Sequence, residues 1–210
     1  MSPVGSSPTS MRILRDALPF AVPSLLLAAV LWWIGYAWVG AAFLLLAAFV
    51  CFFFRDPERI PPQDERAILS PADGKIIQVT GGPDGTRLSI FLSVFDVHVN
   101  RAPVSGRIEE CEHRTGRFHL AFDERASLEN EQLRLKIGDV RFALIAGLVA
   151  RRIIPWKKLG DEVRAGDRIA LIRFGSRVDL WLPFAAQIRV KQGDRVKAGV
   201  SILAWRGEPT

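Results

Sequence analysis

The heptapeptide GDEVRAG at residues 160–166 recurs as GDRVKAG at residues 193–199. Each copy is followed by an apolar run, at residues 169–172 and 200–203 respectively. Glycine readily adopts positive φ angles, and an aspartate side chain can bond the backbone of its own turn. The repeat therefore predicts the same turn twice, each time leading into a strand.

Short strand-like segments fill the rest of the chain from residue 68 onward. They are Lys75–Val79, Leu88–Leu92, Val140–Ala146, Ile169–Arg173 and Val178–Leu182. Many short strands separated by Gly and Asp turns are typical of an all-β barrel or sandwich. A polar stretch at residues 124–132 is predicted to be helix or loop.

The repeated turn resembles the one found in biotinyl/lipoyl-type barrel-sandwich folds. Carrier proteins with that fold need a modifiable lysine at a hairpin tip, and no such lysine stands in either copy. The repeat thus indicates a mainly-β, barrel-sandwich-like domain and not a carrier function.

A segment without any charge, PFAVPSLLLAAVLWWIGYAWVGAAFLLLAAFVCFFF, occupies residues 19–54. A membrane helix needs about 20 apolar residues, so this run is too long for one helix and slightly short for two spans. With a turn bracketed by Gly35 and Gly40, it predicts a membrane-associated helical hairpin of residues 19–34 and 38–54. A signal peptide and a buried helical pair are the alternatives, although the run is long for a signal peptide and lacks its cleavage site.

Arginines flank the hairpin on both sides, Arg12 and Arg15 before it and Arg55 and Arg59 after it. Positive flanks favour the cytoplasmic side for both ends, which predicts a cell-membrane protein with its β domain in the cytoplasm. Prolines near residue 60 interrupt the helical pattern. We therefore expect a flexible N-terminus (1–18), the hairpin (19–54) and a β domain (55–210).

The formal net charge is +6 and the pI about 9.9, which favours an anionic partner. An anionic membrane or a phosphorylated substrate fits better than nucleic acid, because no nucleic-acid-binding motif is present. The two cysteines and three histidines show no zinc-ligand spacing, and Cys51 and Cys111 lie in unlike surroundings. We expect a reducing compartment and no metal, and the sequence leaves the oligomeric state open.

The pair Gly175-Ser176 lies between two strand-like runs, in IRFGSRVD at residues 172–179. Such a pair usually marks a turn. It also permits chemistry: the serine hydroxyl can attack the preceding peptide bond to give an ester. β-Elimination then leaves dehydroalanine, which loses ammonia and becomes a pyruvoyl group. The hydroxyl would need a general base, and the Gly175 carbonyl oxygen would need hydrogen-bond donors.

Two further residues are candidates for the chemistry. His98 follows Asp96 inside the apolar, strand-like run 90–99, and histidine as a residue type titrates near neutrality. It is either a general acid or base or a structural histidine. Asp73, in SPADG at 70–74, either orients a catalytic histidine or belongs to an Asp-Gly hairpin turn. His113 and His119 lie in a charged stretch and are expected at the surface.

Three segments, in this order, resemble the short, pyruvoyl-dependent type of phosphatidylserine decarboxylase: SPADG (70–74), FDVHVNRAP (95–103) and RFGSRVD (173–179). The resemblance covers most of residues 50–205, and the other similar segments are FFRDPER (53–59), FLS (91–93), ASLENE (126–131) and GLVARRI (147–153).

The resemblance implies self-cleavage between Gly175 and Ser176, giving a β chain (1–175) and an α chain (176–210). Ser176 would become the pyruvoyl cofactor, with no metal and no pyridoxal phosphate. Its ketone would form a Schiff base with phosphatidylserine and accept electrons as CO2 leaves, so that phosphatidylethanolamine is the product. Asp73 and His98 would assist cleavage, decarboxylation or both.

Longer family members carry H-x-x-H where this chain has His98 and Arg101, as in the short branch. Arg101 is either a contact for a carboxylate or phosphate or a solvated surface residue. Two other functions stay open. One is a related phospholipid-serine decarboxylase of the archaetidylserine type, and the other is a non-enzymatic, membrane-tethered β-domain adaptor with an uncut Gly175-Ser176 bond.

Overall fold

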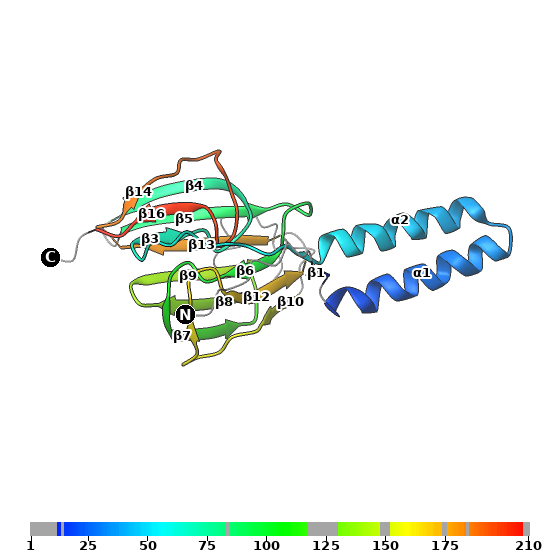
Figure 1. Cartoon of the computed structure of the whole chain (residues 1–210), viewed down its shortest axis with the longest axis horizontal. Helices are drawn as coiled ribbons and strands as arrows, with labels where there is room; N and C mark the ends of the chain where they lie inside the picture. The colour runs from blue at the N-terminus through cyan, green and yellow to red at the C-terminus, as the bar shows by residue number, and fades with distance from the viewer. Residues whose placement is uncertain are drawn as a thin grey trace, which may run out of the picture. The chain divides into compact units, whose positions relative to one another are not determined.

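The computed structural model describes residues 12–13, 15–82, 85–116, 130–147, 152–173, 176–183 and 185–207. These residues form two compact units, which divide after Glu58 and are called here the hairpin unit and the β unit. The expected fold class is confirmed, because a mainly-β unit follows a pair of N-terminal helices (Figure 1).

The hairpin unit consists of α1 (Leu18–Trp33), preceded by the 3-10 turn η1 (Arg15–Ala17), and α2 (Ala37–Phe53). Two short strands, β1 (Arg12–Ile13) and β2 (Arg55–Asp56), pair with each other at its base. Gly35 makes the turn with a φ of 90°. Gly40 does not bracket the turn as expected: it lies inside α2, where a Cβ would stand 2.9 Å from the Ala28 carbonyl oxygen of α1.

Most of the residues that the two helices bury are small, the exceptions being Val50 and Phe53 of α2. Ala21, Ser24 and Ala28 of α1 and Gly40 and Ala47 of α2 are buried, whereas the side chains of Trp33, Trp38 and Leu45 are mostly exposed. Seams of small residues are typical of helices that pack within lipid.

The length and composition of the helices set limits on a membrane crossing. Residues Arg15–Trp33 form a segment of 19 residues with a mean hydropathy of 1.6, long and apolar enough to cross a membrane. The 17 residues of α2 extend about 25 Å at the α-helical rise, against a hydrocarbon core of roughly 30 Å.

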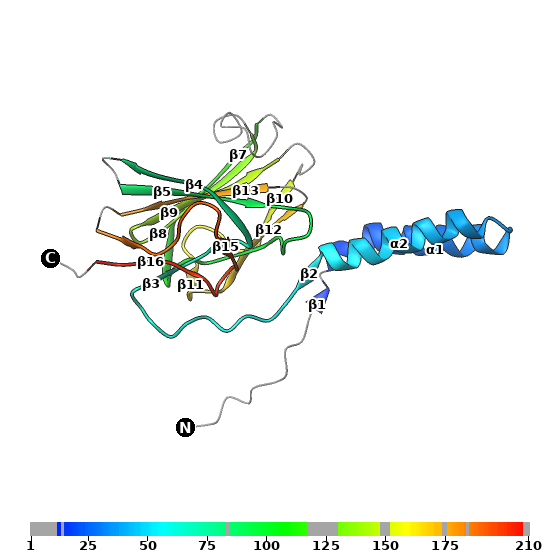
Figure 2. The ribbon, with the colours of Figure 1, turned by 90° about the horizontal axis from the view of Figure 1, so that it is seen from above.

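The β unit contains fourteen of the described strands. They are β3 (Ala67–Leu69), β4 (Gly74–Gly82), β5 (Gly85–Leu92), β6 (Val99–Arg101), β7 (Gly106–Arg114), β8 (Gln132–Ile137), β9 (Val140–Ala146), β10 (Arg152–Pro155), β11 (Glu162–Val163), β12 (Arg168–Arg173), β13 (Ser176–Leu182), β14 (Gln187–Ile188), β15 (Arg195–Val196) and β16 (Ile202–Trp205). One antiparallel sheet has the order β11-β7-β8-β9-β13-β5-β4-β15, and two smaller sheets have the orders β10-β12-β6 and β14-β16-β3. Figure 2 shows β3, β11 and β16 on one side of the β unit and β5 and β13 on the other.

The β unit has an approximate internal two-fold symmetry. Counted inward from the two edges of the eight-stranded sheet, β15, β4, β5 and β13 correspond to β11, β7, β8 and β9. The two smaller sheets correspond in the same way, β14-β16-β3 to β10-β12-β6. In Figure 1, β3, β4, β5, β13, β14 and β16 accordingly lie in one half of the β unit, and β6, β7, β8, β9, β10 and β12 in the other. The two GDxVxAG turns occupy equivalent places: the first lies against APVSGRI (102–108) and the second against SPADGKI (70–76).

Gly74 begins β4 with a φ of 150°, and a Cβ on it would fall onto the Phe91 carbonyl oxygen. Gly74→Ala is therefore expected to lower the free energy of unfolding by about 3 kcal/mol, from backbone strain and the displacement of β5. The measurement is urea unfolding of the full chain followed by near-UV circular dichroism. Gly81→Ala, in the same strand with open space around its Cβ, is the control. Equal midpoints for the two variants would contradict the prediction.

Candidate active site

Ser176 is the first residue of β13, a central strand of the eight-stranded sheet. Its neighbours across the sheet are Leu92, the last residue of β5, and Ala146, the last residue of β9. The side chain is fully buried, and its Oγ has no hydrogen-bond partner among the described residues. A buried polar atom left unsatisfied costs about 1–3 kcal/mol, so this hydroxyl calls for a functional explanation. Gly175, which precedes it, lies outside the described residues.

Asp73 lies at the same end of this sheet as Ser176. It immediately precedes β4, and Lys75 of β4 pairs with Phe91 of β5, next to Leu92. Because Leu92 pairs with Ser176, a single strand separates the strands that carry Asp73 and Ser176. The structure thus gathers two residues that stand far apart in the sequence at one end of the sheet.

Both oxygens of the Asp73 carboxylate accept hydrogen bonds. Its Oδ1 accepts the backbone N–H of Ala198 at 2.8 Å, and its Oδ2 accepts Arg59 Nη2 at 2.9 Å. Burial raises the pKa of Asp73, against the opposing effects of the Ala198 N–H and the Arg59 guanidinium, and nearby Asp96 raises it further. The Asp73-Gly74 pair is not a hairpin turn, because β3 and β4 do not pair and its side chain instead holds a turn distant in sequence.

The apolar run around His98 is not a continuous strand, contrary to expectation. β5 ends at Leu92, and a turn follows in which Asp96 Oδ2 accepts the Ser93 N–H at 2.8 Å and the Ser93 hydroxyl at 2.7 Å. Asp96 therefore breaks the run by capping this turn, and His98 follows it outside the strand.

His98 is fully buried, and its Nδ1 lies 2.9 Å from the Asp96 carbonyl oxygen. A carbonyl can only accept, so this bond places a proton on Nδ1 and leaves the lone pair of a neutral ring on Nε2. The His98 carbonyl accepts the N–H of Ile172 at 3.2 Å. His98 therefore lies beside β12, the strand whose chain continues to Ser176. Even so, Ser176 Oγ is hydrogen-bonded to neither His98 nor Asp73, all three being described.

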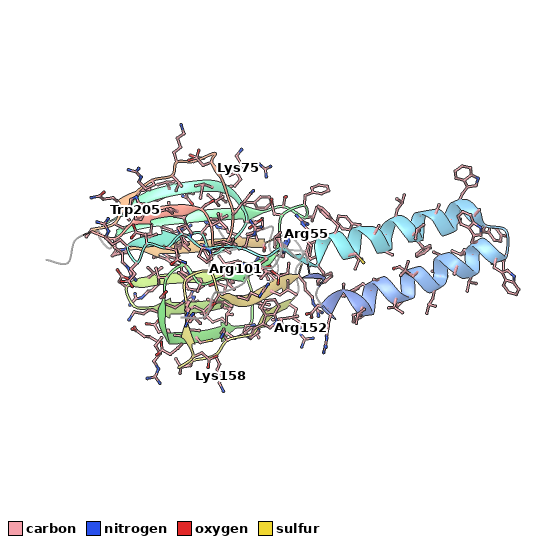
Figure 3. The ribbon with its side chains drawn as sticks, in the orientation of Figure 1. Arg55, Lys75, Arg101, Arg152, Lys158 and Trp205 are labelled. Carbon is pink, nitrogen blue, oxygen red and sulfur yellow. The ribbon has the colours of Figure 1, made fainter. Side chains whose placement is uncertain are left out.

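Arg101 is buried at 5% exposure, which excludes the alternative of a solvated surface residue. Its Nη1 donates to the Gly166 carbonyl at 3.0 Å, and its Cδ lies 2.9 Å from where a Cβ on Gly199 would stand. The last glycines of the two repeated turns, Gly166 and Gly199, therefore both lie next to the Arg101 side chain. Figure 3 shows Arg101 in the middle of the β unit, while Lys75 and Lys158 point outward on opposite sides. Its contact with a substrate stays a prediction.

The remaining two histidines lie away from these contacts or outside the described part. His113 is exposed, as expected, and its Nε2 lies 2.9 Å from Glu131 Oε1. His119 lies outside the described residues, as do residues 124–129 of the polar stretch expected to be helix or loop. The end of that stretch, Gln132, begins β8.

A buried ionic network lies on the opposite face of β13 and was not predicted. Arg177 Nε is 2.6 Å from Asp179 Oδ1, and Arg177 Nη2 donates to Ser89 Oγ at 2.9 Å. Both charged side chains are at most 1% exposed. Buried ions are tolerated when their hydrogen bonds are satisfied, and this network fixes β13 against β5 one residue from Ser176. The alternating charges in an otherwise apolar strand were the signal available in the sequence.

Asn130 and Glu131, the described end of the ASLENE segment, hold the strand on the other side of Ser176. Asn130 Nδ2 donates to the Ala146 carbonyl at 2.7 Å, and the Ala146 N–H donates to the Glu131 carbonyl at 3.0 Å. Both residues are buried. They fix the end of β9, which is where Ala146 faces Ser176.

A cavity of about 930 Å³ lies elsewhere on the eight-stranded sheet, around Trp181, Arg87 and Arg141, and is not lined by Ser176, His98 or Asp73. Within the described ranges, no group of three or more His, Cys, Asp or Glu side chains is placed to hold a metal ion.

The chain is similar to known proteins of one family. The family model described as phosphatidylserine decarboxylase matches residues 46–204. A phosphatidylserine decarboxylase proenzyme of Geobacter sulfurreducens is 44% identical over 194 residues, which cover 87% of this chain and 89% of that protein. A protein of the same name from Geotalea uraniireducens is 42% identical over 202 residues, covering 91% of this chain and 95% of that protein. The chain therefore belongs to the phosphatidylserine decarboxylase family.

Proposed function

We propose that this protein decarboxylates phosphatidylserine to phosphatidylethanolamine and CO2, using a pyruvoyl group that it makes from its own Ser176. Family membership supports the reaction. The observation that supports a pyruvoyl cofactor is the Ser176 hydroxyl, which is fully buried and has no hydrogen-bond partner among the described residues. Ser176 is also the first residue of a central strand.

The proposed processing uses groups already in the chain. Ser176 Oγ attacks the Gly175 carbonyl carbon while its proton passes to a base, and the C–N bond breaks to give an ester and a free amine. Loss of the Ser176 α-proton then expels the Gly175 carboxylate and leaves dehydroalanine. Water converts the imine tautomer of this group to a ketone, and ammonia leaves.

The surroundings of Ser176 would suit a pyruvoyl group, since its buried hydroxyl has no hydrogen-bond partner among the described residues that the conversion would break. When formed, its ketone supplies an electron sink for the carbanion that remains after CO2 departs. The side chain of Ser176 is fully buried, which limits competition by bulk water with its hydroxyl.

His98 is the proposed general base for the Ser176 hydroxyl. Its Nδ1 proton is hydrogen-bonded to the Asp96 carbonyl, so the lone pair of a neutral ring is on Nε2, where it can accept a proton. The hydrogen bond that it would make with Ser176 is formed only as the residues approach, as catalytic bonds often are. Asp73 is the proposed source of negative charge at this end of the sheet, where it stabilises a protonated histidine.

The hairpin unit supports a place at the cell membrane. Its exposed large apolar side chains and its seam of small residues suit a lipid environment, and the net charge of +6 suits an anionic phospholipid surface. Arginines at both ends of the hairpin favour the cytoplasmic side for the β unit. An anchored enzyme would meet its two-chain substrate by diffusion within the bilayer.

Intact-mass spectrometry of the purified protein tests the proposal. The expected result is two chains, residues 1–175 and 176–210, with the smaller lighter by one molecule of ammonia than a serine-ended fragment. Vesicles of phosphatidylserine labelled in the serine carboxyl should then release labelled CO2. A single uncut chain without decarboxylase activity would overturn the proposal and favour the adaptor. Release from a serine phospholipid with ether-linked chains alone would favour the archaetidylserine type.

A further inference from the structure

The internal two-fold symmetry provides a second copy of the surroundings of Asp73, against which its role can be measured. SPADGKI (70–76) and APVSGRI (102–108) are equivalent, so that Asp73 corresponds to Ser105. Gly74 and Gly106 have φ angles of 150° and 148°. The N–H groups of Gly193 and Gly160 bond the carbonyls of Ile76 and Ile108 at 2.8 and 2.9 Å.

In both copies, the residue before the glycine accepts one hydrogen bond from the opposing turn. Asp73 Oδ1 accepts the Ala198 N–H at 2.8 Å, and Ser105 Oγ accepts the Ala165 N–H at 2.9 Å. A neutral hydroxyl is therefore sufficient to hold this turn. The negative charge of Asp73 exceeds what the fold requires, and burying a charge is unfavourable unless it is paired.

The partner that makes the charge tolerable comes from outside the duplicated elements. Arg59, at the start of the β unit, donates from Nη2 to Asp73 Oδ2 at 2.9 Å, and the two side chains are 12% and 11% exposed. Asp96 also acts on Asp73 from the turn after β5, and Asp96 in turn lies 3.6 Å from exposed Arg195. Of these groups, only Arg59 is hydrogen-bonded to Asp73 through its side chain.

The sign of the effect of Arg59 follows from these contacts. Burial raises the pKa of Asp73, and Arg59 opposes that rise. Removal of Arg59 would raise the pKa further, so that Asp73 would hold its proton to a higher pH. A neutral Asp73 could no longer stabilise the protonated form of His98, the proposed general base.

We propose that Arg59 is a positioning residue for self-processing: through its hydrogen bond to Oδ2, it holds the Asp73 carboxylate in place at the end of the sheet where Ser176 begins β13. This inference rests on the proposed function. It makes the first residue after the hairpin unit part of the machinery that matures the β unit, although Arg59 does not itself touch the reacting atoms.

The test follows processing of the full chain as a function of pH. Precursor is made by cell-free synthesis with nanodiscs of anionic phospholipid and shifted to buffers from acid to alkaline pH, and loss of the 23.4 kDa chain is timed on gels. We expect Arg59→Gln to slow processing at least about tenfold at neutral pH and to move the acid limb of the rate profile to higher pH, while Arg59→Lys restores part of both. Arg66→Gln, which breaks a surface pair with Asp64, is the matched control and should follow the wild type.

A variant of Asp73 separates positioning from folding. Asp73→Ser copies the second half of the molecule, so it should fold with a urea midpoint near that of the uncut Ser176→Ala chain and fail to process at a normal rate. Adding Arg59→Gln to Asp73→Ser should then slow processing no further, because the two residues act through one interaction.

Two outcomes would overturn the inference: a rate profile of Arg59→Gln that overlies the wild type, or a further loss of rate in the double variant as large as in the single one. If Arg59→Gln unfolds, Arg59→Met decides, because it keeps much of the side-chain volume without the charge: an unshifted acid limb and a wild-type rate would contradict the role. A wild-type chain that is never cleaved would instead contradict the proposed function itself.

Discussion

Ser176→Ala is expected to leave the protein as one uncut chain with no decarboxylase activity. The substitution removes the only atom that can form the ester, and loss of a catalytic serine lowers rates by on the order of 10⁶-fold. Intact mass and release of labelled CO2 from phosphatidylserine vesicles give the two readouts. A cleaved or active Ser176→Ala protein would contradict the proposed cofactor.

The stability of the same variant distinguishes loss of chemistry from loss of fold. Because Ser176 Oγ is buried and has no partner among the described residues, its removal should leave the free energy of unfolding unchanged or raise it by about 1 kcal/mol. Ser176→Cys, which keeps a nucleophile of similar size, should still cleave at a measurable rate. A strongly destabilised Ser176→Ala would show that the hydroxyl has a structural role.

His98→Ala is expected to slow self-processing by about 10²–10⁴-fold, the usual contribution of a positioned general base. His98→Gln should be equally slow, because an amide of similar size cannot take the proton. The measurement is the rate at which full-length precursor disappears after cell-free synthesis.

His113→Ala, at an exposed histidine bonded to Glu131, is the matched control and should process normally. Thermal unfolding of each precursor shows whether a slow variant is folded. Normal processing by folded His98→Gln would remove His98 from the site and leave it a structural histidine held by the Asp96 carbonyl.

The parts of the fold that carry a strong local pattern could be predicted. The uncharged run gave the two helices to within one residue at each end, because apolar length alone specifies them. Apolar strands such as β9 and β13 were also recognised. β7 (GRIEECEHR) was missed, because it lies near the edge of the sheet with most side chains exposed and has no apolar run. Its counterpart in the other half, β4, was recognised only in its apolar part.

The candidate residues could be named from the sequence, but their contacts could not. The local motif around Asp73 suggested a hairpin turn, whereas its carboxylate bonds residues 59 and 198. The repeat GDxVxAG was visible in the sequence. The corresponding segments SPADGKI and APVSGRI are less alike, and the position of Asp73 holds Ser105 in the second. Only the sheet order showed that Asp73 and Ser105 are equivalent, because the two halves of the β unit are interleaved along the chain.

The place of β13 between β5 and β9 has a consequence for the life of the mature protein. After a cut before Ser176, residues 176–210 would remain paired with strands of the other chain. β13 is hydrogen-bonded to β5 and β9, β15 pairs with β4, and β16 pairs with β3. The fragment could not leave without unfolding most of the β unit. Once unfolded, the two chains would have to associate again as separate molecules, so refolding of the cut protein would depend on its concentration, whereas refolding of the uncut chain would not.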